Sequence, residues 1–176
     1  MYDFYYFALV PEKNEKRSLE FTVTLVDDDA LFLETLKDYL HSVNITQVET
    51  FSSGEDFLAS FQPKDSRFIV CDFDFGTSGS LNGLQVLEEV RRRNASTPVV
   101  ILSSQDKLDI ALKTLRSGAL DYFIKGNEST FTTVMTSILK TNEIFKLKKD
   151  KKDFITLGII GTVLFSILLL ASYFYR

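Results

Sequence analysis

The spacing of apolar positions changes repeatedly between residues 21 and 141. Short runs rich in β-branched and aromatic residues, typical of buried strands, alternate with stretches whose apolar residues recur every three or four positions, as on one face of a helix. In the stretch 31–43, for example, Leu33, Leu36 and Leu40 lie at helical spacing. The pattern predicts strands at 21–26, 46–51, 68–71, 98–102 and 120–124, and helices at 31–43, from Ser53 or Gly54 onward, at 83–93, at 108–115 and from 127 to about 149.

These five strand–helix pairs predict an α/β domain over residues 21–141. Strands that are almost wholly apolar and are separated by helices are typical of a parallel sheet covered on both faces. Right-handed crossovers then make this a doubly wound five-stranded parallel sheet. In such sheets functional residues collect just beyond the carboxyl ends of the strands.

The C-terminal pattern is different, because the stretch from Phe154 to Tyr175 contains no charged residue. At about 1.5 Å per residue a helix of this length reaches roughly 33 Å, enough for a hydrocarbon core of about 30 Å. Lysines gather just before the stretch, and such an excess marks the cytoplasmic end of a span. The sequence therefore predicts a single-pass transmembrane helix over 154–175, with the α/β domain cytoplasmic and the C-terminus outside.

Two segments flank these parts. Residues 142–153 form a basic juxtamembrane helix or linker, and either an unbroken rod or a break around 148–153 is compatible with the absence of Pro and Gly there. Residues 1–20 are predicted to be an N-terminal extension, either an extra strand or a loosely docked segment. Phe4–Val10 is apolar but lacks the basic n-region and the cleavage site of a signal peptide.

Charge and cysteine content narrow the function. The formal net charge of −4 gives no basic footprint, so nucleic acid is not an expected partner. The single cysteine, Cys71, excludes an internal disulfide framework and cysteine-rich zinc clusters, and is expected to be a small core residue. His41, the one histidine, is expected on the surface near the end of the first helix.

Polar residues follow four of the five predicted strands. If the sheet is parallel, these side chains meet at one edge: Asp27, Asp28 and Asp29 after the first strand, Asp72 and Asp74 after the third, Ser103 and Ser104 after the fourth, and Lys125 after the fifth. Clustered carboxylates repel each other unless a cation joins them. A hard, oxygen-liganded ion such as Mg²⁺ suits this set, and the added lysine and hydroxyl suit a phosphoryl group.

The order and spacing of these pieces resemble the CheY-like receiver domain of two-component response regulators. The resemblance rests on Leu25-Val26-Asp27-Asp28, Val70-Cys71-Asp72, Val99-Val100-Ile101-Leu102-Ser103 and Tyr122-Phe123-Ile124-Lys125. It covers about residues 21–141 and implies the flavodoxin-like receiver fold. It also implies a sensor histidine kinase or a phosphotransfer protein as partner, and usually a bacterial setting, here the inner membrane.

The resemblance further implies a role for each residue of the site. Asp72 would accept the phosphoryl group. Asp28 and Asp72 would bind Mg²⁺ directly, Asp27 through water and Asp74 through its backbone carbonyl. Ser103 would hydrogen-bond the phosphoryl group and Lys125 would pair with it. Tyr122 matches the switch aromatic, which turns inward as Ser103 moves and so changes the surface of the fourth helix, fifth strand and fifth helix.

The chain departs from the family pattern at three places. Phe75-Gly76 stands where Met-Pro is usual, residues 77–80 lengthen the following loop, and Gly126 replaces the proline that usually follows the lysine. These differences bear on the rate of dephosphorylation and on the shape of the partner surface. They leave the acidic site complete.

Several alternatives stay open from sequence. Asp74 is a second candidate acceptor, Asp29 is expected to cap the first helix, and Ser104 is placed to cap the helix after the fourth strand. Small residues at Gly158, Thr162 and Ser166 admit a homodimer. A signalling switch is expected rather than a turnover enzyme, with an unphosphorylated scaffold or a Mg²⁺-dependent phosphatase with an aspartate nucleophile as alternatives.

Overall fold

The computed structural model describes residues 18–76, 81–104, 107–126 and 129–175, apart from the side chains of residues 169, 172 and 174. Contacts within the chain divide it into two units, Met1–Leu139 and Lys140–Arg176. Most of the predicted N-terminal extension, residues 1–17, and the predicted loop insertion at 77–80 lie outside the described residues.

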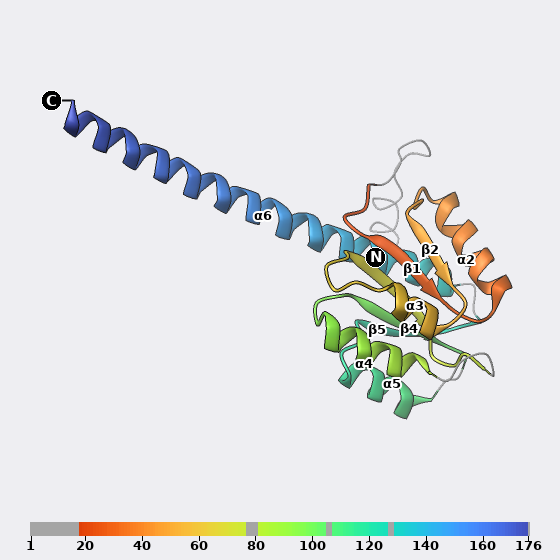
Figure 1. Ribbon diagram of the computed structural model, residues 1–176. Coiled ribbons are helices and arrows are strands. Elements are labelled where there is room, and N and C mark those ends of the chain that lie inside the picture. The colour runs from red at the N-terminus through yellow and green to blue at the C-terminus, as the bar shows by residue number, and fades with distance from the viewer. Residues whose placement is uncertain (1–17, 77–80, 105–106, 127–128, 176) are drawn as a thin grey trace. The chain divides into compact units, whose positions relative to one another are not determined.

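The first unit contains a five-stranded parallel sheet, as the sequence predicts (Figure 1). The strand order is β2-β1-β3-β4-β5. The strands are β1 (Thr22–Val26), β2 (Val48–Phe51), β3 (Arg67–Asp72), β4 (Val99–Ser103) and β5 (Asp121–Ile124). The helices are α2 (Ala30–Ser42), α3 (Gly54–Ser60), α4 (Gly83–Arg93), α5 (Leu108–Arg116) and α6 (Ser129–Phe174).

Apolar side chains of alternate strand positions pack against different helices. Ile69, Cys71 and Ile101 join one buried cluster with side chains of α3 and α4. The start of α6 instead contacts α2, where the Phe131 ring lies 5.6 Å from the ring of Tyr39, centroid to centroid. Helices therefore cover both faces of the sheet, and this explains why its inner strands are apolar along their length.

Cys71 lies in the buried cluster, one position before the end of β3, and its side chain is inaccessible to solvent. Burial, reinforced by the nearby carboxylates of Asp72 and Asp27, raises the pKa of the Cys71 thiol well above its usual value. The thiol is therefore protonated and unreactive in the folded protein. The expectation of a small core residue is confirmed.

Side-chain hydrogen bonds cap the starts of α2 and α4. The Asp29 carboxylate accepts hydrogen bonds from the backbone N–H groups of Leu31 and Phe32, both at 3.0 Å, as predicted for the cap of α2. Asn82 and Gln85 form a reciprocal capping box at the start of α4. The predicted cap at Ser104 is wrong, because α5 begins only at Leu108, with Lys107 as its N-cap residue and no side-chain cap bond.

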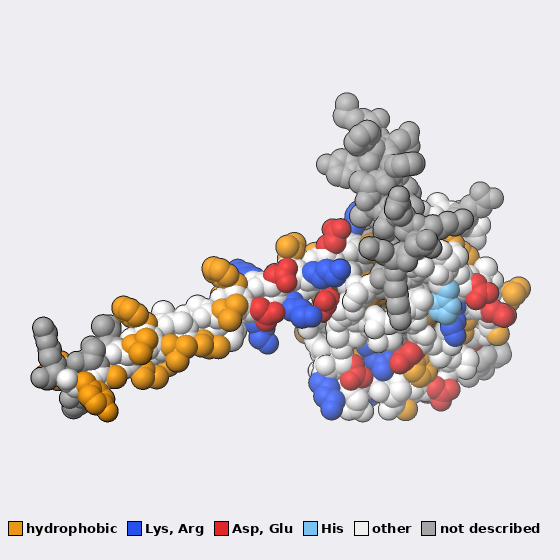
Figure 2. Space-filling view, turned by 90° about the horizontal axis from the view of Figure 1, so that it is seen from above, with side chains coloured by type: hydrophobic (Ala, Val, Ile, Leu, Met, Phe, Trp, Pro, Cys, Tyr) orange, Lys and Arg blue, Asp and Glu red, His pale blue; other side chains and the backbone are white. Residues whose placement is uncertain are grey.

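Helix α6 continues without a break through residues 148–153 and ends at Phe174. Apolar and mostly exposed side chains gather along its C-terminal part (Figure 2). Among the described residues, however, no helix is both long enough and apolar enough to cross a membrane. The described side chains of the uncharged stretch are continuous only from Phe154 to Leu168, about 22 Å of helix. The predicted span over 154–175 thus receives no support from the structure.

Candidate functional site

The register of the sheet brings the predicted site residues to one edge. Val26 pairs with Cys71, so the residues that follow them, Asp27 and Asp72, leave β1 and β3 side by side. On the other side of β3, Asp72 pairs with Leu102, next to Ser103. Ser103 in turn pairs with Ile124, the residue before Lys125. The site lies where the chain order reverses between β1 and β3, the usual position for function in an open α/β sheet.

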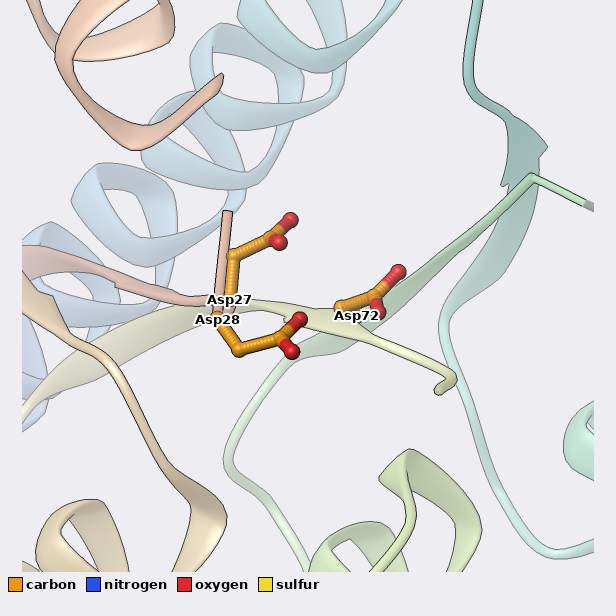
Figure 3. A group of neighbouring side chains, drawn as sticks. All are labelled: Asp27, Asp28 and Asp72. Carbon is orange, nitrogen blue, oxygen red and sulfur yellow. The ribbon is translucent and has the colours of Figure 1, made fainter. Parts of the chain in front are cut away.

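Three carboxylates form the acidic part of this site (Figure 3). Oxygen atoms of Asp27, Asp28 and Asp72 all lie within 4.8 Å of one another. Asp27 and Asp72 are buried, whereas Asp28 is partly exposed. The cluster therefore has a dry side, formed by Asp27 and Asp72, and a side that solvent reaches.

Lys125 lies between the two buried carboxylates. Its Nζ is 2.6 Å from Asp27 Oδ2 and 2.7 Å from Asp72 Oδ1, and its side chain is only 14% exposed. Short, buried and charge-assisted contacts of this kind are stronger than surface ion pairs. Lys125 therefore offsets the negative charge that burial would otherwise make costly.

Burial still dominates the ionisation of the acids. It raises the pKa of Asp72 to about 6, even though the hydrogen bond and the charge of Lys125 act to lower it. The pKa of Asp27 is raised by the same cause against the same opposition. Burial lowers the pKa of Lys125, but its contacts with Asp27 and Asp72 outweigh this, so the net shift is upward and the lysine stays charged.

Backbone N–H groups orient the acids. Asp27 Oδ1 accepts a hydrogen bond from Asp29 N at 3.0 Å, and Asp72 Oδ2 accepts one from Asp74 N at 3.1 Å. Each buried carboxylate is thus held by one backbone N–H and by Lys125, with its direction fixed before any ligand arrives.

Asp74 lies apart from the three clustered acids. Its Oδ1 accepts a hydrogen bond from Gly76 N at 3.2 Å, which closes the turn after β3. Gly76 has a φ of 57°, a left-handed conformation that glycine adopts without strain. Of the four predicted metal residues, the structure brings three side chains together, and the expected role of the Asp74 carbonyl stays a prediction.

The two predicted switch residues lie on neighbouring strands. Ser103 is buried at the end of β4, and its carbonyl oxygen accepts a hydrogen bond from Lys125 N at 2.7 Å. Tyr122, in β5, is partly buried and lines a cavity of about 300 Å³ between α5, β5 and the first turns of α6. Their movement on phosphorylation stays a prediction.

The donor set fits a hard divalent cation. The clustered ligand atoms are all carboxylate oxygens, which Mg²⁺ and Ca²⁺ prefer. Burial raises the pKa values of Asp27 and Asp72 despite Lys125, and a nearby cation would act in the opposite direction. Asp28, the partly exposed acid, is the one on the side that solvent reaches.

One residue of the site was not found from sequence. Phe32, in the first turn of α2, places its ring under the lysine, with Lys125 Nζ 4.6 Å from the ring centroid. This is the geometry of a cation–π interaction. The only feature of the sequence that could have indicated this role is an aromatic residue five positions after Asp27, and such a residue is usually interpreted as part of the hydrophobic core.

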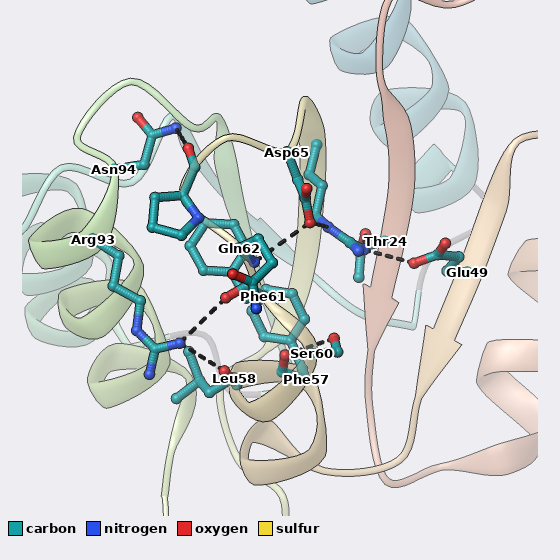
Figure 4. A network of polar contacts seen from close by, with 12 residues as sticks. Thr24, Glu49, Phe57, Leu58, Ser60, Phe61, Gln62, Asp65, Arg93 and Asn94 are labelled. Carbon is teal, nitrogen blue, oxygen red and sulfur yellow. Dashed lines mark hydrogen bonds and ion pairs between the residues drawn. The ribbon is translucent and has the colours of Figure 1, made fainter.

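A second charged network lies at the opposite edge of the sheet (Figure 4). Arg67, the first residue of β3, donates to Glu49 Oε2 at 2.6 Å and to Thr24 Oγ1 at 3.0 Å. Nearby, Arg93 Nη1 donates to the Leu58 carbonyl at 2.7 Å and so ties the end of α4 to α3. These charges are satisfied within the fold, so we assign this network a structural role.

Comparison with known proteins agrees with this geometry. The family model of the response regulator receiver domain matches residues 23–136. The transcriptional regulatory protein MalR of Bacillus subtilis is 29% identical over 130 residues, which cover 73% of this chain and 54% of MalR. The transcriptional regulatory protein QseB of Haemophilus influenzae is 33% identical over 103 residues, which cover 58% of this chain and 45% of QseB. The chain thus spans about half the length of these two relatives.

Solved structures show the same fold. The receiver domain of the Francisella response regulator 1452 superposes with a TM-score of 0.63 at 23% identity, covering 72% of this chain and 99% of that one. The receiver domain of NtrX from Brucella abortus gives a TM-score of 0.60 at 22% identity, covering 68% and 98%. The strand order, the acidic edge with its lysine and the match of the family model agree: the chain belongs to the family of response regulator receiver domains.

Proposed function

We propose that the chain accepts a phosphoryl group on Asp72, with Mg²⁺, from a sensor histidine kinase or a phosphotransfer protein, and that it signals through protein–protein contacts. The observation that supports this is Lys125 held between two buried carboxylates beside a third. Such a site can receive one more anionic group if a divalent cation joins it. The chain would act as a phosphoacceptor switch rather than as a turnover enzyme.

In the transfer, an Asp72 oxygen attacks phosphorus and forms a P–O bond as the P–N bond to the donor histidine breaks. The histidine leaves with the bonding electron pair and takes up a proton. A bound Mg²⁺ would offset the charge of the phosphoryl oxygens, with Asp28 and Asp72 as direct ligands, Asp27 through water and Asp74 through its carbonyl.

The remaining residues act on the phosphorylated state. Lys125, now 2.7 Å from Asp72 Oδ1, needs only a small movement to pair with a phosphoryl oxygen. Ser103 would donate its hydroxyl hydrogen to another phosphoryl oxygen. Tyr122 would turn inward as Ser103 moves, and would thereby change the surface of α5, β5 and α6 that partners contact.

The acceptor is tested by intact mass spectrometry of the protein incubated with Mg²⁺ and a small phosphodonor. We expect one added phosphoryl group, lost in Asp72→Asn and after chelation but kept in the matched variant Asp74→Asn. An adduct that survives in Asp72→Asn would move the acceptor to Asp74 or elsewhere. No adduct in the unmodified chain, despite Mg²⁺ binding, would favour a scaffold or a phosphatase.

We further propose that residues 154–175 anchor the chain in a cell membrane, in the family's usual setting a bacterial inner membrane. The support is the uncharged stretch itself and the five lysines before it, Lys146, Lys148, Lys149, Lys151 and Lys152. The receiver domain would then be cytoplasmic and the C-terminus outside. A homodimer through Gly158, Thr162 and Ser166 is compatible with such an anchor.

Extraction of cell membranes at alkaline pH tests the anchor. The full chain should stay with the lipid, whereas a variant with both Leu164→Lys and Leu168→Lys should be released, because each lysine at mid-span costs about 2.5–3.5 kcal/mol. The matched variant with isoleucine at both positions should behave as the original. Release of the original chain would contradict the anchor without affecting phosphorylation.

A further inference from the structure

Lys125 has a third contact besides its two carboxylates. Its Nζ lies 4.6 Å from the centroid of the Phe32 ring, within the range of a cation–π interaction. The lysine is therefore held between negative oxygens and an aromatic face. Any displacement of Nζ toward a group on Asp72 changes its position relative to this ring.

The Phe32 ring also contacts α6. Its centroid lies 5.6 Å from that of Phe131, with the planes at 69°, an edge-to-face arrangement. Phe131 is the third residue of α6. One ring of α2 thus touches both the lysine of the site and the first turn of the last helix.

A third aromatic ring, that of Tyr39, also packs against Phe131. The Tyr39 centroid lies 5.6 Å from Phe131, and the Tyr39 hydroxyl lies 3.3 Å from Thr132 Oγ1 and 3.9 Å from Met135 Sδ. Phe32, Phe131 and Tyr39, which we call the aromatic link, therefore connect Lys125 to the first two turns of α6.

We propose that the aromatic link couples the occupancy of Asp72 to the start of α6, with Phe32 as the positioning residue. When Lys125 leaves Asp72 Oδ1 for a phosphoryl oxygen, it moves relative to the Phe32 ring, and the edge-to-face contact passes this change to Phe131. This inference rests on the proposed phosphorylation of Asp72.

The route differs from the one through Ser103 and Tyr122. That pair lies on β4 and β5 and leads to the cavity between α5, β5 and α6. The aromatic link instead passes through α2, on the face of the sheet away from α3 and α4. The output helix α6 would then receive the signal at two places.

The geometry is tested first without any phosphoryl group. In NMR spectra of the full chain in detergent micelles, the ring current of Phe32 should shift the Lys125 Cε protons upfield. The upfield shift should vanish in Phe32→Leu and persist in Phe32→Tyr and in Leu31→Ala, an exposed neighbour on the same helix. Unshifted Cε protons in the original chain would overturn the proposal.

The coupling is tested by hydrogen exchange of the full chain with Mg²⁺, before and after addition of beryllofluoride, which mimics the phosphoryl group on an aspartate. In the original chain, beryllofluoride should change the rate of amide hydrogen exchange both around Asp72 and Ser103 and within residues 129–138. In Phe32→Leu the change within 129–138 should be at least twofold smaller, while the change around Asp72 and Ser103 is kept. Phe32→Tyr and Leu31→Ala should both show the full change within 129–138.

The outcomes separate the two proposals. A full response of residues 129–138 in Phe32→Leu would overturn the aromatic link and leave phosphorylation of Asp72 untouched. No response anywhere in the original chain, together with no mass adduct, would overturn both. If Phe32→Leu does not fold, Phe131→Leu interrupts the link from its other end and must show the same loss.

Discussion

At the scale of single residues, the site is defined by charges held out of water. Asp27 and Asp72 are nearly inaccessible to solvent, and one lysine serves both. An isolated buried charge is strongly unfavourable, and a pair is stable only if its hydrogen bonds are also satisfied. Burial therefore makes the charged forms of Asp27 and Asp72 costly, and Lys125 offsets only part of this cost.

The pH dependence of stability follows from Asp72. Because its pKa in the folded, metal-free protein is about 6, above the usual 3.8, the folded state binds more protons than the unfolded state between these values. The free energy of unfolding should fall by about 1–3 kcal/mol as pH rises from 4 to 6 in the presence of a chelator. Asp27 acts in the same direction. Urea unfolding followed by circular dichroism should show a smaller fall in Asp72→Asn, and an unchanged fall would contradict this account.

Removal of the lysine should destabilise the metal-free protein. Lys125→Met leaves two buried carboxylates of like charge without a positively charged partner, so we expect the free energy of unfolding at pH 7 to drop by about 3 kcal/mol. At pH 5, where the carboxyls take up protons, the loss should be smaller. Lys107→Met, at the start of α5, serves as the control, and an equal loss in both variants would argue against the charge explanation.

At the scale of secondary-structure elements, the start of α4 fixes the end of β3. Gly83 N donates to the Phe73 carbonyl at 2.9 Å, and the Asn82–Gln85 capping box closes the first turn. A Cβ at Gly83 would lie 2.2 Å from the Asp72 carbonyl oxygen and 2.9 Å from Phe73 Cα. The helix approaches the end of β3 so closely that only glycine fits.

Gly83→Ala should therefore destabilise the fold and disturb the site. Alanine gains up to about 1 kcal/mol over glycine in a helix, but the clash is with backbone atoms, and overpacking costs about 1–3 kcal/mol. We expect net destabilisation by about 1–2 kcal/mol and weaker Mg²⁺ binding, measured by denaturation and calorimetry. Gly158→Ala, where a Cβ meets nothing within 4 Å, should show neither effect.

Much of the fold could be predicted because it depends on local patterns. The apolar runs of β1, β3 and β4 and the acids that follow them place Asp27 and Asp72 at one edge once the strands are parallel. The Asp29 cap follows from a residue type that accepts backbone hydrogen bonds. The apolar runs, the acids that follow them and the helix cap can each be recognised from residues that are close together in the sequence.

The features that could not be predicted depend on distant residues or on small offsets. The position of Phe32 between Lys125 and Phe131 requires the packing of α2, β5 and α6, which no periodicity encodes. The prediction that Ser104 caps the helix after β4 was wrong, because α5 begins four residues after Ser104, at Leu108. The span predicted over 154–175 has no support among the described residues, where no helix is both long and apolar enough to cross a membrane.

At the scale of the whole molecule, the acids follow β1 and β3, the two neighbouring strands between which the chain order reverses. A cation that joins Asp28 and Asp72 would therefore link the two sides of the sheet and bind only when the sheet is folded. Binding of this kind raises stability by mass action, by about 2.7 kcal/mol at a concentration one hundred times Kd.

Mg²⁺ should consequently raise the Tm of the full chain in a concentration-dependent way, as followed by scanning calorimetry. Asp28→Asn should reduce the increase strongly, since it removes a ligand without removing a buried charge partner of Lys125. Asp38→Asn, on the far part of α2, is the matched control and should respond as the original. An equal increase in all three would show that the ion acts elsewhere.

The buried thiol of Cys71 is a natural probe for local opening of β3, the central strand of the sheet. Because the side chain is inaccessible and its pKa is raised, a maleimide can react only when β3 separates from the helices that cover it. The rate of labelling therefore reports how often β3 opens next to Asp72, with no engineered probe. Mg²⁺ should slow this labelling, and an unchanged rate would mean that the strand opens without releasing the ion.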